Sequence, residues 1–272
     1  MRITVGVITL NEESNIERCL RSIEGVADEI LVVDSGSTDR TRVLAGAFGV
    51  RWESLPWQGY VGQKNQVLSL ASHPWVLSLD ADEALSPLLR SEILALKLSA
   101  EEDHSVSGYS IPRCVCYEGH WIRRGDWYPD RLVRLFRREK ARFTGGRVHE
   151  RLELEGRSVE LKGELEHYSF RDAADHLARC RLYARLWAED RWGHGKRCGR
   201  FSPYSHAFFR WFRGFILRGG IADGKLGLRI ANYSAYEVFL KYTWLRELQR
   251  GHSPWNSPSA PRISSPREDL SR

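Results

Sequence analysis

The chain has 272 residues, of which 42% are hydrophobic and 28% are charged, and its formal net charge is +6. This is the composition of a folded protein, and it excludes a collagen, a coiled coil and a small disulfide-rich scaffold. The charge is unevenly distributed, since residues 1–110 contain 9 basic and 16 acidic side chains and residues 111–272 contain 32 and 19. The basic part predicts a phosphate-bearing partner: an anionic membrane, a charged small molecule or a nucleic acid.

The first residues, the length of the apolar segments and the spacing of the cysteines indicate the cellular compartment of the protein. Residues 3–8 form an apolar run without a preceding basic segment or a following cleavage site, so we expect a first strand and not a signal peptide. No stretch has the roughly 18 apolar residues of a membrane span. The five cysteines include no Cys-x-x-Cys pair, which argues against a disulfide framework or a zinc site and favours a reducing, cytoplasmic environment.

The first 110 residues alternate between strand-like and helix-like patterns. Strands are expected at residues 3–9, 29–33, 50–53 and 75–79, and helices at residues 14–23, 62–71 and 87–98. Apolar strands that alternate with helices predict a parallel sheet with helices on both faces. Ser37 or Thr38 is expected to cap the helix after the second strand.

The pattern is less regular after residue 108. Strands are expected at residues 109–117 and 131–137, on either side of an aromatic, Gly-containing loop, and a helix is expected at residues 172–191. The last 22 residues are rich in Ser and Pro, which predicts a disordered tail.

Three polar clusters follow the first, second and fourth predicted strands, at residues 9–12, 34–39 and 80–83. Ligands of open α/β sheets bind beyond these strand ends, so we expect the clusters to converge on one crevice. Asp80 and Asp82 offer carboxylate oxygens to Mg²⁺ or Mn²⁺ and leave positions for phosphate oxygens, although such a pair alone is more often a solvated turn. Asp34 could accept hydrogen bonds from a base or a ribose.

With these clusters, the sequence resembles the inverting glycosyltransferases of family 2, which have the GT-A fold. The resemblance covers roughly residues 1–155. Its blocks are Val-Ile-Thr-Leu-Asn-Glu at residues 7–12, Val-Asp-Ser-Gly-Ser-Thr-Asp at 33–39, Gln-Lys-Asn at 63–65 with Ala71, and Leu-Asp-Ala-Asp-Glu at 79–83. A narrower resemblance, to bacterial lipopolysaccharide core β-1,4-glucosyltransferases, rests on Trp-Tyr-Pro-Asp-Arg at 127–131, Arg-Leu-Phe-Arg-Arg at 134–138 and Val-His-Glu at 148–150.

The resemblance implies a Rossmann-like α/β sheet that binds a nucleoside diphosphate sugar, UDP-glucose, with Mg²⁺ or Mn²⁺ as cofactor. It implies that Asp82 is the better metal ligand and that Asp80 contacts the ribose or joins the metal site. Lys64 would lie near the nucleotide or its phosphates. The residues that would hold the nucleoside are Thr9, Asn11, Glu12 and Asp34.

An inverting transfer needs a general base that accepts the proton of the acceptor hydroxyl. The family places this base in an acidic pair after the Asp-x-Asp motif, and His149 and Glu150 occupy that place here. Glu150 is therefore the first choice, with Asp130 and Asp126 of the aromatic loop as rivals. His149 is expected either to join the metal or to orient Glu150.

Residues 200–248 carry two predicted amphipathic helices that the catalytic motifs do not explain. The first has Tyr204, Phe208, Trp211, Phe212 and Phe215 at helical spacing, with Arg210, Arg213 and Arg218 nearby. Such helices suit an anionic membrane surface, and packing against the core is the alternative. We therefore expect a catalytic domain at residues 1–165, a membrane- or acceptor-associated helical extension at 166–250 and a disordered tail at 251–272.

The sequence thus predicts a glycosyltransferase that is peripheral on the cytoplasmic face of the inner membrane. It would move a hexose, glucose, to a lipid-linked or lipopolysaccharide-core acceptor, with polyprenyl phosphate or another cell-envelope glycan as the alternative. A nucleic-acid-binding α/β protein is the alternative from another class, and it predicts salt-sensitive binding to DNA or RNA. The acidic first part argues against it, so no nucleic-acid partner is expected. The complete set of carboxylates argues against a silent sugar-nucleotide sensor.

Overall fold

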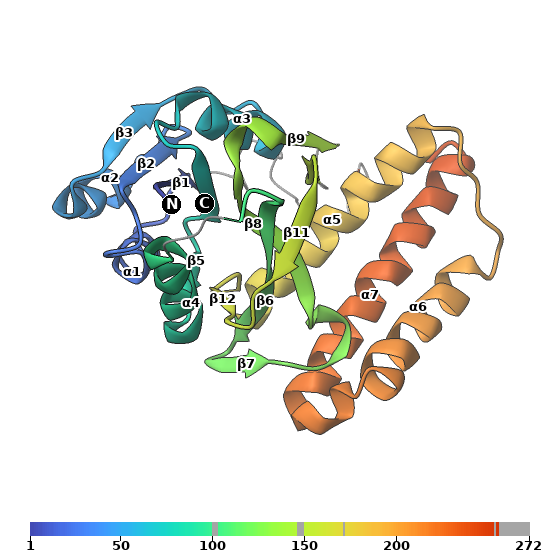
Figure 1. Cartoon of the computed structure of the whole chain (residues 1–272). Coiled ribbons are helices and arrows are strands. Elements are labelled where there is room, and N and C mark those ends of the chain that lie inside the picture. The colour runs from blue at the N-terminus through green and yellow to red at the C-terminus, as the bar shows by residue number, and fades with distance from the viewer. Residues whose placement is uncertain (100–102, 146–149, 171, 253, 256–272) are drawn as a thin grey trace. The chain divides into compact units, whose positions relative to one another are not determined.

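The computed structural model describes residues 1–99, 103–145, 150–170, 172–252 and 254–255 (Figure 1). They form two compact units. The sheet unit consists of Met1–Val115 and Asp130–Ser169, and the helical unit consists of Cys116–Pro129 and the described residues from Phe170 onward. The tail expected at residues 251–272 lies almost entirely outside the described residues.

The sheet unit alternates strands and helices in its first part and is mostly strands afterwards. Its helices are α1 (Ile16–Ser22), α2 (Thr41–Ala45), α3 (Gly59–Leu70) and α4 (Pro87–Leu98). Its strands are β1 (Ile3–Thr9), β2 (Glu29–Asp34), β3 (Arg51–Ser54), β4 (Trp75–Asp80), β5 (Glu83–Leu85), β6 (Val106–Tyr117), β8 (Asp130–Arg137), β9 (Ala141–Gly145), β10 (Glu150–Leu154), β11 (Arg157–Glu160) and β12 (Leu165–His167).

One mixed sheet connects most of these strands, in the order β3-β2-β1-β4-β8-β6-β12-β5. The first four strands are parallel, whereas β8 runs antiparallel to both β4 and β6. Strands β9 and β10 form a separate antiparallel pair. The parallel sheet expected for the first 110 residues is therefore confirmed for β1 to β4. Of the later strands, β11 and β12 are also parallel to β6, whereas β8 is antiparallel to it because the two are joined without the crossover helix that a parallel pair needs.

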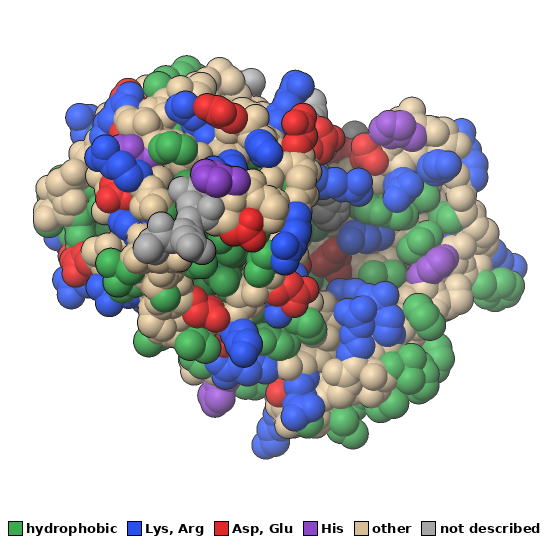
Figure 2. Space-filling model, in the orientation of Figure 1, with side chains coloured by type: hydrophobic (Ala, Val, Ile, Leu, Met, Phe, Trp, Pro, Cys, Tyr) green, Lys and Arg blue, Asp and Glu red, His purple; other side chains and the backbone are tan. Residues whose placement is uncertain are grey.

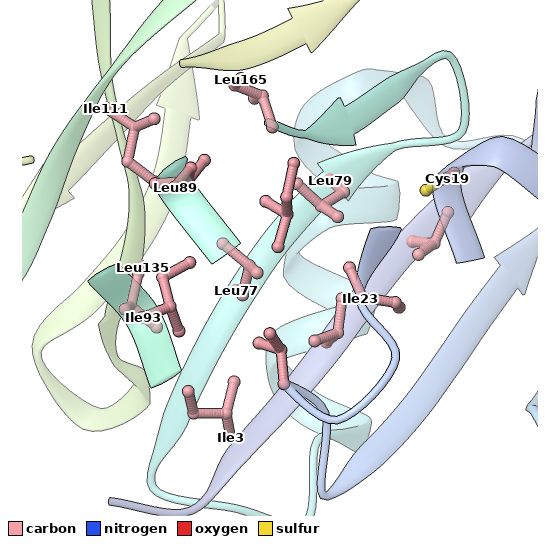
Figure 3. Packing of buried hydrophobic residues seen from close by; sticks show 14 of the residues in the cluster. Ile3, Cys19, Ile23, Leu77, Leu79, Leu89, Ile93, Ile111, Leu135 and Leu165 are labelled. Atoms are coloured by element: carbon pink, nitrogen blue, oxygen red, sulfur yellow. The ribbon is translucent and has the colours of Figure 1, made fainter. Parts of the chain in front are cut away.

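Helices cover both faces of the parallel strands, as predicted, because successive side chains of a buried strand point to opposite faces. One face packs against α1 and α4; Figure 3 shows Leu77 and Leu79 of β4 together with Cys19, Ile23, Leu89 and Ile93 of the helical side. On the other face, Ile8, Leu31, Val33 and Val76 pack with Val67 and Leu68 of α3.

Helix α3 lies very close to β1 at Gly6. A Cβ atom on Gly6 would be only 2.0 Å from Cγ1 of Val67, so no larger residue fits without moving the helix. Lys64 and Val67 are three positions apart and therefore share one face of α3. The close approach at Gly6 brings that face, with Lys64, against the sheet.

The helical unit is built on α5 (Ala173–Gly193), α6 (Ser202–Phe212) and α7 (Gly224–Gln249), with α7 in contact with the other two. It also contains β7 (His120–Ile122), the 3₁₀ turns Gly125–Trp127 and Gly220–Asp223, and a π-helical turn at Arg213–Leu217. The predicted helix at 172–191 is confirmed as α5, which Asp172 caps by accepting a hydrogen bond from the N–H of Asp175. Among the helices described, none is both long enough and apolar enough to cross a membrane.

The aromatic loop contributes to the core of the helical unit. Trp127 stacks on Phe170, with ring centroids 5.3 Å apart, and Tyr117 and Ile122 are buried beside them. His176 of α5 lies in this cluster, with Nδ1 3.1 Å from the Tyr117 hydroxyl. Burial lowers the pKa of His176 from 6.5 to about 4. His176 is therefore a neutral core residue at pH 7.

Candidate active site

The strands β1, β2 and β4 end at one edge of the sheet. In the strand register Thr9 lies opposite Asp34, and Ile8 lies opposite Asp80. The following loops stay together, since the Ser35 N–H donates to the Thr9 carbonyl at 3.0 Å and the Ala81 N–H donates to the Ile8 carbonyl at 3.1 Å. The structure thus brings the three polar clusters together at this edge, as the sequence predicted.

Asn11 and Glu12 tie the loop after β1 to the loop after β2. Asn11 has a positive φ of 55°, which Asn tolerates better than most residues. Its N–H donates to the Ser37 hydroxyl at 2.9 Å, and its side-chain oxygen accepts from the Thr38 N–H at 2.8 Å. The Glu12 N–H donates to the Thr41 hydroxyl at 2.8 Å.

These contacts correct the predicted helix cap. Ser37 and Thr38 bind Asn11, and α2 begins only at Thr41. The carboxylate of Asp39 accepts the Thr41 N–H at 2.9 Å, so Asp39 satisfies the first turn of the helix. The expectation that Ser37 or Thr38 caps α2 was wrong because the loop after β1 competes for both residues.

Asp34 is buried at the end of β2 and folds back on its own loop. Its carboxylate accepts the N–H groups of Gly36 and Ser37, each at 3.0 Å, and Gly36 supplies the positive φ of 103° that this turn requires. The Ser37 hydroxyl also donates to this carboxylate, so three donor groups of the loop take up most of its about four acceptor positions, and only what they leave is open to a ligand. The nearby Thr9 hydroxyl is buried, and no described residue hydrogen-bonds to it.

Lys64 joins three elements at the site. Only 1% of its side chain is exposed, and its Nζ lies 3.1 Å from Oδ1 of Asp80 and 2.9 Å from Oε1 of Glu150. It therefore links α3 to the end of β4 and the start of β10. The two carboxylates are partly exposed, so one buried ammonium holds two solvent-facing acids side by side.

A buried ion pair supports Asp80 from the other side. Arg134 of β8 places Nη2 2.7 Å from Oε1 of Glu83 and 3.2 Å from Oδ2 of Asp80. The other oxygen of Glu83 accepts the Asp80 N–H at 3.0 Å. Burial alone would raise the pKa of Asp80, but the charges of Lys64 and Arg134 outweigh it and hold that pKa well below its usual range. Asp80 is therefore ionised at every physiological pH.

Glu83 was expected at this edge only as part of the cluster at residues 80–83, without a role of its own, and its ion pair with Arg134 was not predicted. The signal for Arg134 was its place within a strand among apolar residues, between Val133 and Leu135. A charged side chain between two such neighbours needs a buried partner. Which acid supplies it depends on the pairing of β4 with β8, which the sequence does not reveal.

Asp82 meets a histidine that the sequence did not indicate. Nε2 of His167 lies 3.3 Å from Oδ2 of Asp82, and both side chains are mostly buried. The pairing of β12 with β5 places His167 opposite Glu83 and so brings it to this site. His149, the predicted metal or orienting residue, lies outside the described residues. Within the described part of the chain, no group of three or more His, Cys, Asp or Glu residues is placed to share a metal ion.

The two rival bases lie in different surroundings. Asp130 is held by Arg113, whose Nη2 and Nε lie 2.6 Å and 3.1 Å from one carboxylate oxygen. Asp126 belongs to the helical unit, where only 4% of its side chain is exposed and three arginines surround it. Of the two candidates in the sheet unit, Glu150 and Asp130, only Glu150 contacts the Lys64–Asp80 pair among the described residues.

The chain is similar in sequence to known glycosyltransferases. The model of the family "Glycosyl transferase family 2" matches residues 4–152, more than half of the chain. A glycosyltransferase of Rickettsia typhi is 30% identical, with 91% of this chain and 87% of that protein covered. The lipopolysaccharide core biosynthesis glycosyltransferase LpsC of Rhizobium meliloti is 32% identical, with 88% and 93% covered.

A solved structure is also similar over part of the chain. It is glucosyl-3-phosphoglycerate synthase from Mycobacterium tuberculosis in complex with Mn²⁺, UDP-glucose and phosphoglyceric acid. The likeness has 27% identity and a TM-score of 0.34 and covers 44% of this chain and 45% of that one, which is too little to support a conclusion. The family model spans β1 to β10 and so includes the strand ends that carry Asp34, Asp80 and Glu150. The chain belongs to glycosyl transferase family 2 and is a glycosyltransferase.

Proposed function

We propose that the protein transfers glucose from UDP-glucose, with inversion and with a divalent cation, to a lipid-linked or lipopolysaccharide-core saccharide. The observation that carries the proposal is the Lys64 ammonium that holds Asp80 and Glu150 together at the strand ends. One carboxylate comes from the donor side of the sheet and the other from β10. The carboxylate of Asp80 would bind the sugar-nucleotide donor, and the carboxylate of Glu150 would accept the proton of the acceptor hydroxyl.

The nucleoside would lie over the ends of β1 and β2. The unpartnered Thr9 hydroxyl and the remaining acceptor positions of Asp34 suit base N–H and ribose O–H groups. Asn11 and Glu12 hold the two loops in register and so shape this part of the site. Asp80, kept ionised by Lys64 and Arg134, would accept a hydrogen bond from a ribose hydroxyl.

Asp82 and His167 fit a divalent cation. A carboxylate oxygen and an imidazole nitrogen 3.3 Å apart are suitable ligands for Mn²⁺, and Mg²⁺ commonly binds to one or two carboxylates together with substrate phosphates. A cation held there would offset the charge of the departing diphosphate. With Asp82 and His167 as protein ligands, the other coordination positions of the cation would be open to phosphate oxygens.

Glu150 is the proposed general base. The Lys64 ammonium lies 2.9 Å from its carboxylate and holds it in place, and 27% of the Glu150 side chain remains exposed to an acceptor. Glu150 would take the hydroxyl proton as the acceptor oxygen attacks the anomeric carbon from the face opposite the diphosphate. Asp130 stays the rival base. Arg113 fixes its carboxylate at the start of β8, and 41% of its side chain is exposed to an acceptor.

The acceptor and the membrane are inferred from the helical unit and from a relative. LpsC is named for lipopolysaccharide core biosynthesis, which suggests a related acceptor on the cytoplasmic face of the inner membrane. On α6, Tyr204, Phe208 and Phe212 are exposed, whereas Trp211 donates to the side-chain oxygen of Asn232. Exposed aromatic side chains of this kind would rest at a lipid surface, so we propose residues 166–250 as the membrane-associated extension.

Binding of the donor tests the proposal directly. The full chain is incubated with a panel of nucleoside diphosphate sugars, with Mg²⁺, with Mn²⁺ or with a chelator, and its melting temperature is measured. UDP-glucose with metal should raise the Tm most, and Asp82→Ala should remove the metal-dependent part. Glu166→Ala, on the same strand as His167, is the control and should behave as wild type. The absence of any stabilisation by every sugar nucleotide would overturn the proposal.

A further inference from the structure

Three arginines converge on one buried carboxylate in the helical unit. Arg210 lies 2.9 Å from Asp126, Arg213 lies 3.0 Å from it and Arg218 lies 3.3 Å from it. Asp126 sits in the 3₁₀ turn Gly125–Trp127, and the arginines come from α6 and the turn that follows it. We call these three side chains with Asp126 the arginine cluster.

The backbone holds the arginine cluster closed on one side. A Cβ on Gly214 would be 3.1 Å from Oδ2 of Asp126, so the π-helical turn passes directly against the carboxylate. The Gly125 N–H also donates to the Arg218 carbonyl at 3.0 Å. The turn that carries Asp126 and the turn that carries the arginines are therefore fixed to each other, which makes the cluster a built feature and not a chance surface contact.

One carboxylate does not balance three guanidinium groups. Burial lowers the pKa of Arg210, and the neighbouring Arg213 and Arg218 lower it further, against the opposing effect of Asp126. A hollow beside the cluster is lined by Arg124, Asp126, Arg210 and Asp223. Counting these with Arg213 and Arg218, and with Glu237, whose charge also acts on Arg210, four positive charges face three negative ones, so the cluster keeps a surplus positive charge.

The surplus charge is accessible. Of the Arg218 side chain 52% is exposed, and Arg210 and Arg213 are partly exposed. The same segment carries exposed apolar side chains at Phe212, Ile216 and Leu217. Figure 2 shows basic and hydrophobic side chains side by side on the visible face of α6 and α7. An anion bound here would have apolar surface next to it.

We infer that the arginine cluster is a binding site for a phosphate ester. Guanidinium groups bind phosphate oxygens through paired N–H donors, and three of them oriented by one carboxylate present such donors without rearrangement. Asp126 is therefore a positioning residue that holds the arginines. The phosphate can come from a membrane lipid headgroup or from a soluble molecule, and the flanking apolar residues favour the lipid. This inference does not depend on the proposed donor, metal or base.

The test measures binding of the full chain to vesicles and to inorganic phosphate. Vesicles of phosphatidylcholine with or without phosphatidic acid are sedimented, and melting temperatures are measured with and without millimolar phosphate. Arg213→Gln with Arg218→Gln leaves Arg210 paired with Asp126, and it should weaken binding to phosphatidic acid about tenfold or more. Arg213→Lys with Arg218→Lys keeps the charge and should retain part of the binding.

A matched control has the same net charge as the Gln variant. Arg197→Gln with Arg250→Gln removes two arginines of the helical unit that lie elsewhere, beside Trp192 and Glu247, and should bind as wild type. Stabilisation by phosphate that the Gln variant loses, without a difference on vesicles, would assign the site to a soluble phosphate ester. Equal losses in both double variants, or no response of the wild type to either probe, would overturn the inference. Stabilisation by UDP-glucose, measured in parallel, should be unchanged in both.

Discussion

The sheet unit and the helical unit each surround a carboxylate with cations, but with opposite balance. At the strand ends, Asp80, Glu83 and Glu150 share Lys64 and Arg134, and Asp82 lies beside His167. In the arginine cluster, three guanidinium groups share Asp126. The first arrangement has acidic groups left for a cation and for sugar hydroxyls, whereas the second has donors left for an anion. The modest net charge of +6 therefore conceals two sites of opposite sign.

The largest expected effect is on catalysis at the acidic site. Glu150→Gln should lower kcat by about 10²–10⁴-fold, because the amide cannot accept the hydroxyl proton, and it should leave donor binding unchanged. Steady-state kinetics and donor-dependent Tm shifts check this. Glu153→Gln is the control, since Glu153 is on the same strand and bonds only to the Thr144 hydroxyl among the contacts resolved. A normal kcat in Glu150→Gln with a loss in Asp130→Asn would move the base to Asp130.

The buried ion pair beneath Asp80 should matter most for stability. Arg134→Met leaves the buried Glu83 with only the more distant Arg113, at 3.6 Å among the described residues, and it should lower the free energy of unfolding by up to about 3 kcal/mol. Urea denaturation measures the change. Arg21→Met removes an exposed partner of Glu17 and should cost less than about 1 kcal/mol. Similar values for the two variants would show that the Arg134–Glu83 pair is not buried in solution.

The two units should respond to acid over different pH ranges. The pKa of His176 is about 4 in the folded helical unit and 6.5 in the unfolded chain. Between these pH values His176 is protonated in the unfolded chain and neutral in the folded one. Stability is therefore lost as the pH falls from 6.5 towards 4, by up to about 3 kcal/mol. His176→Asn should remove this loss in denaturation curves measured across that range, and the exposed His194→Asn should not. A wild-type stability that is flat over this range would contradict the assignment.

The stability of the sheet unit should depend on pH over a lower range, through Glu29. Although burial would raise the pKa of Glu29, hydrogen bonds from the Thr4 hydroxyl and from the N–H and hydroxyl of Ser72 lower it from 4.5 to about 2. The charged Glu29 therefore stabilises the folded state above pH 4.5, and this contribution disappears as the pH falls to about 2. Glu29→Gln should flatten the pH dependence of unfolding between these values only.

The smallest effect on stability is expected on the face of α6. Of the Phe208 side chain 67% is exposed, so Phe208→Ser should change the free energy of unfolding by less than about 0.5 kcal/mol. It should nevertheless weaken binding to anionic vesicles about fivefold, because a phenyl ring no longer enters the lipid surface. Leu98→Ser, at a still more exposed apolar residue of α4, should leave vesicle binding unchanged. Equal vesicle binding by Phe208→Ser and wild type would exclude α6 as the contact surface.

Local patterns explain which parts of the fold were predictable. The strand expected at residues 3–9 and the helix expected at 87–98 coincide with β1 and α4, since both have strong apolar patterns and α4 has its Ser86 cap and Pro87. By contrast, β10 and β11 are short strands in which at least half of the side chains are charged and none is fully buried. Their existence depends on partners distant in sequence, which no local pattern reveals.

The same distinction applies to the site. Asp34, Asp80 and Thr9 could be grouped from the sequence because parallel strands end at one edge. Arg134 and His167 reach the site only through the pairing of β8 and β12. The contact of Asp126 with three arginines of a remote helix was equally hidden. Partners that depend on long-range strand pairing or helix docking were the ones missed.

Gly6 gives the site an unusual kind of vulnerability. It touches no substrate in the proposed mechanism, yet the missing side chain sets the depth at which Val67 docks and hence how far Lys64 can reach. A single methyl group added there would lift the helix that carries the ammonium away from the two acids that it joins. The positions of Asp80 and Glu150 relative to each other therefore depend on a small residue in the core. A substitution at Gly6 would abolish activity although every polar residue of the site is still present.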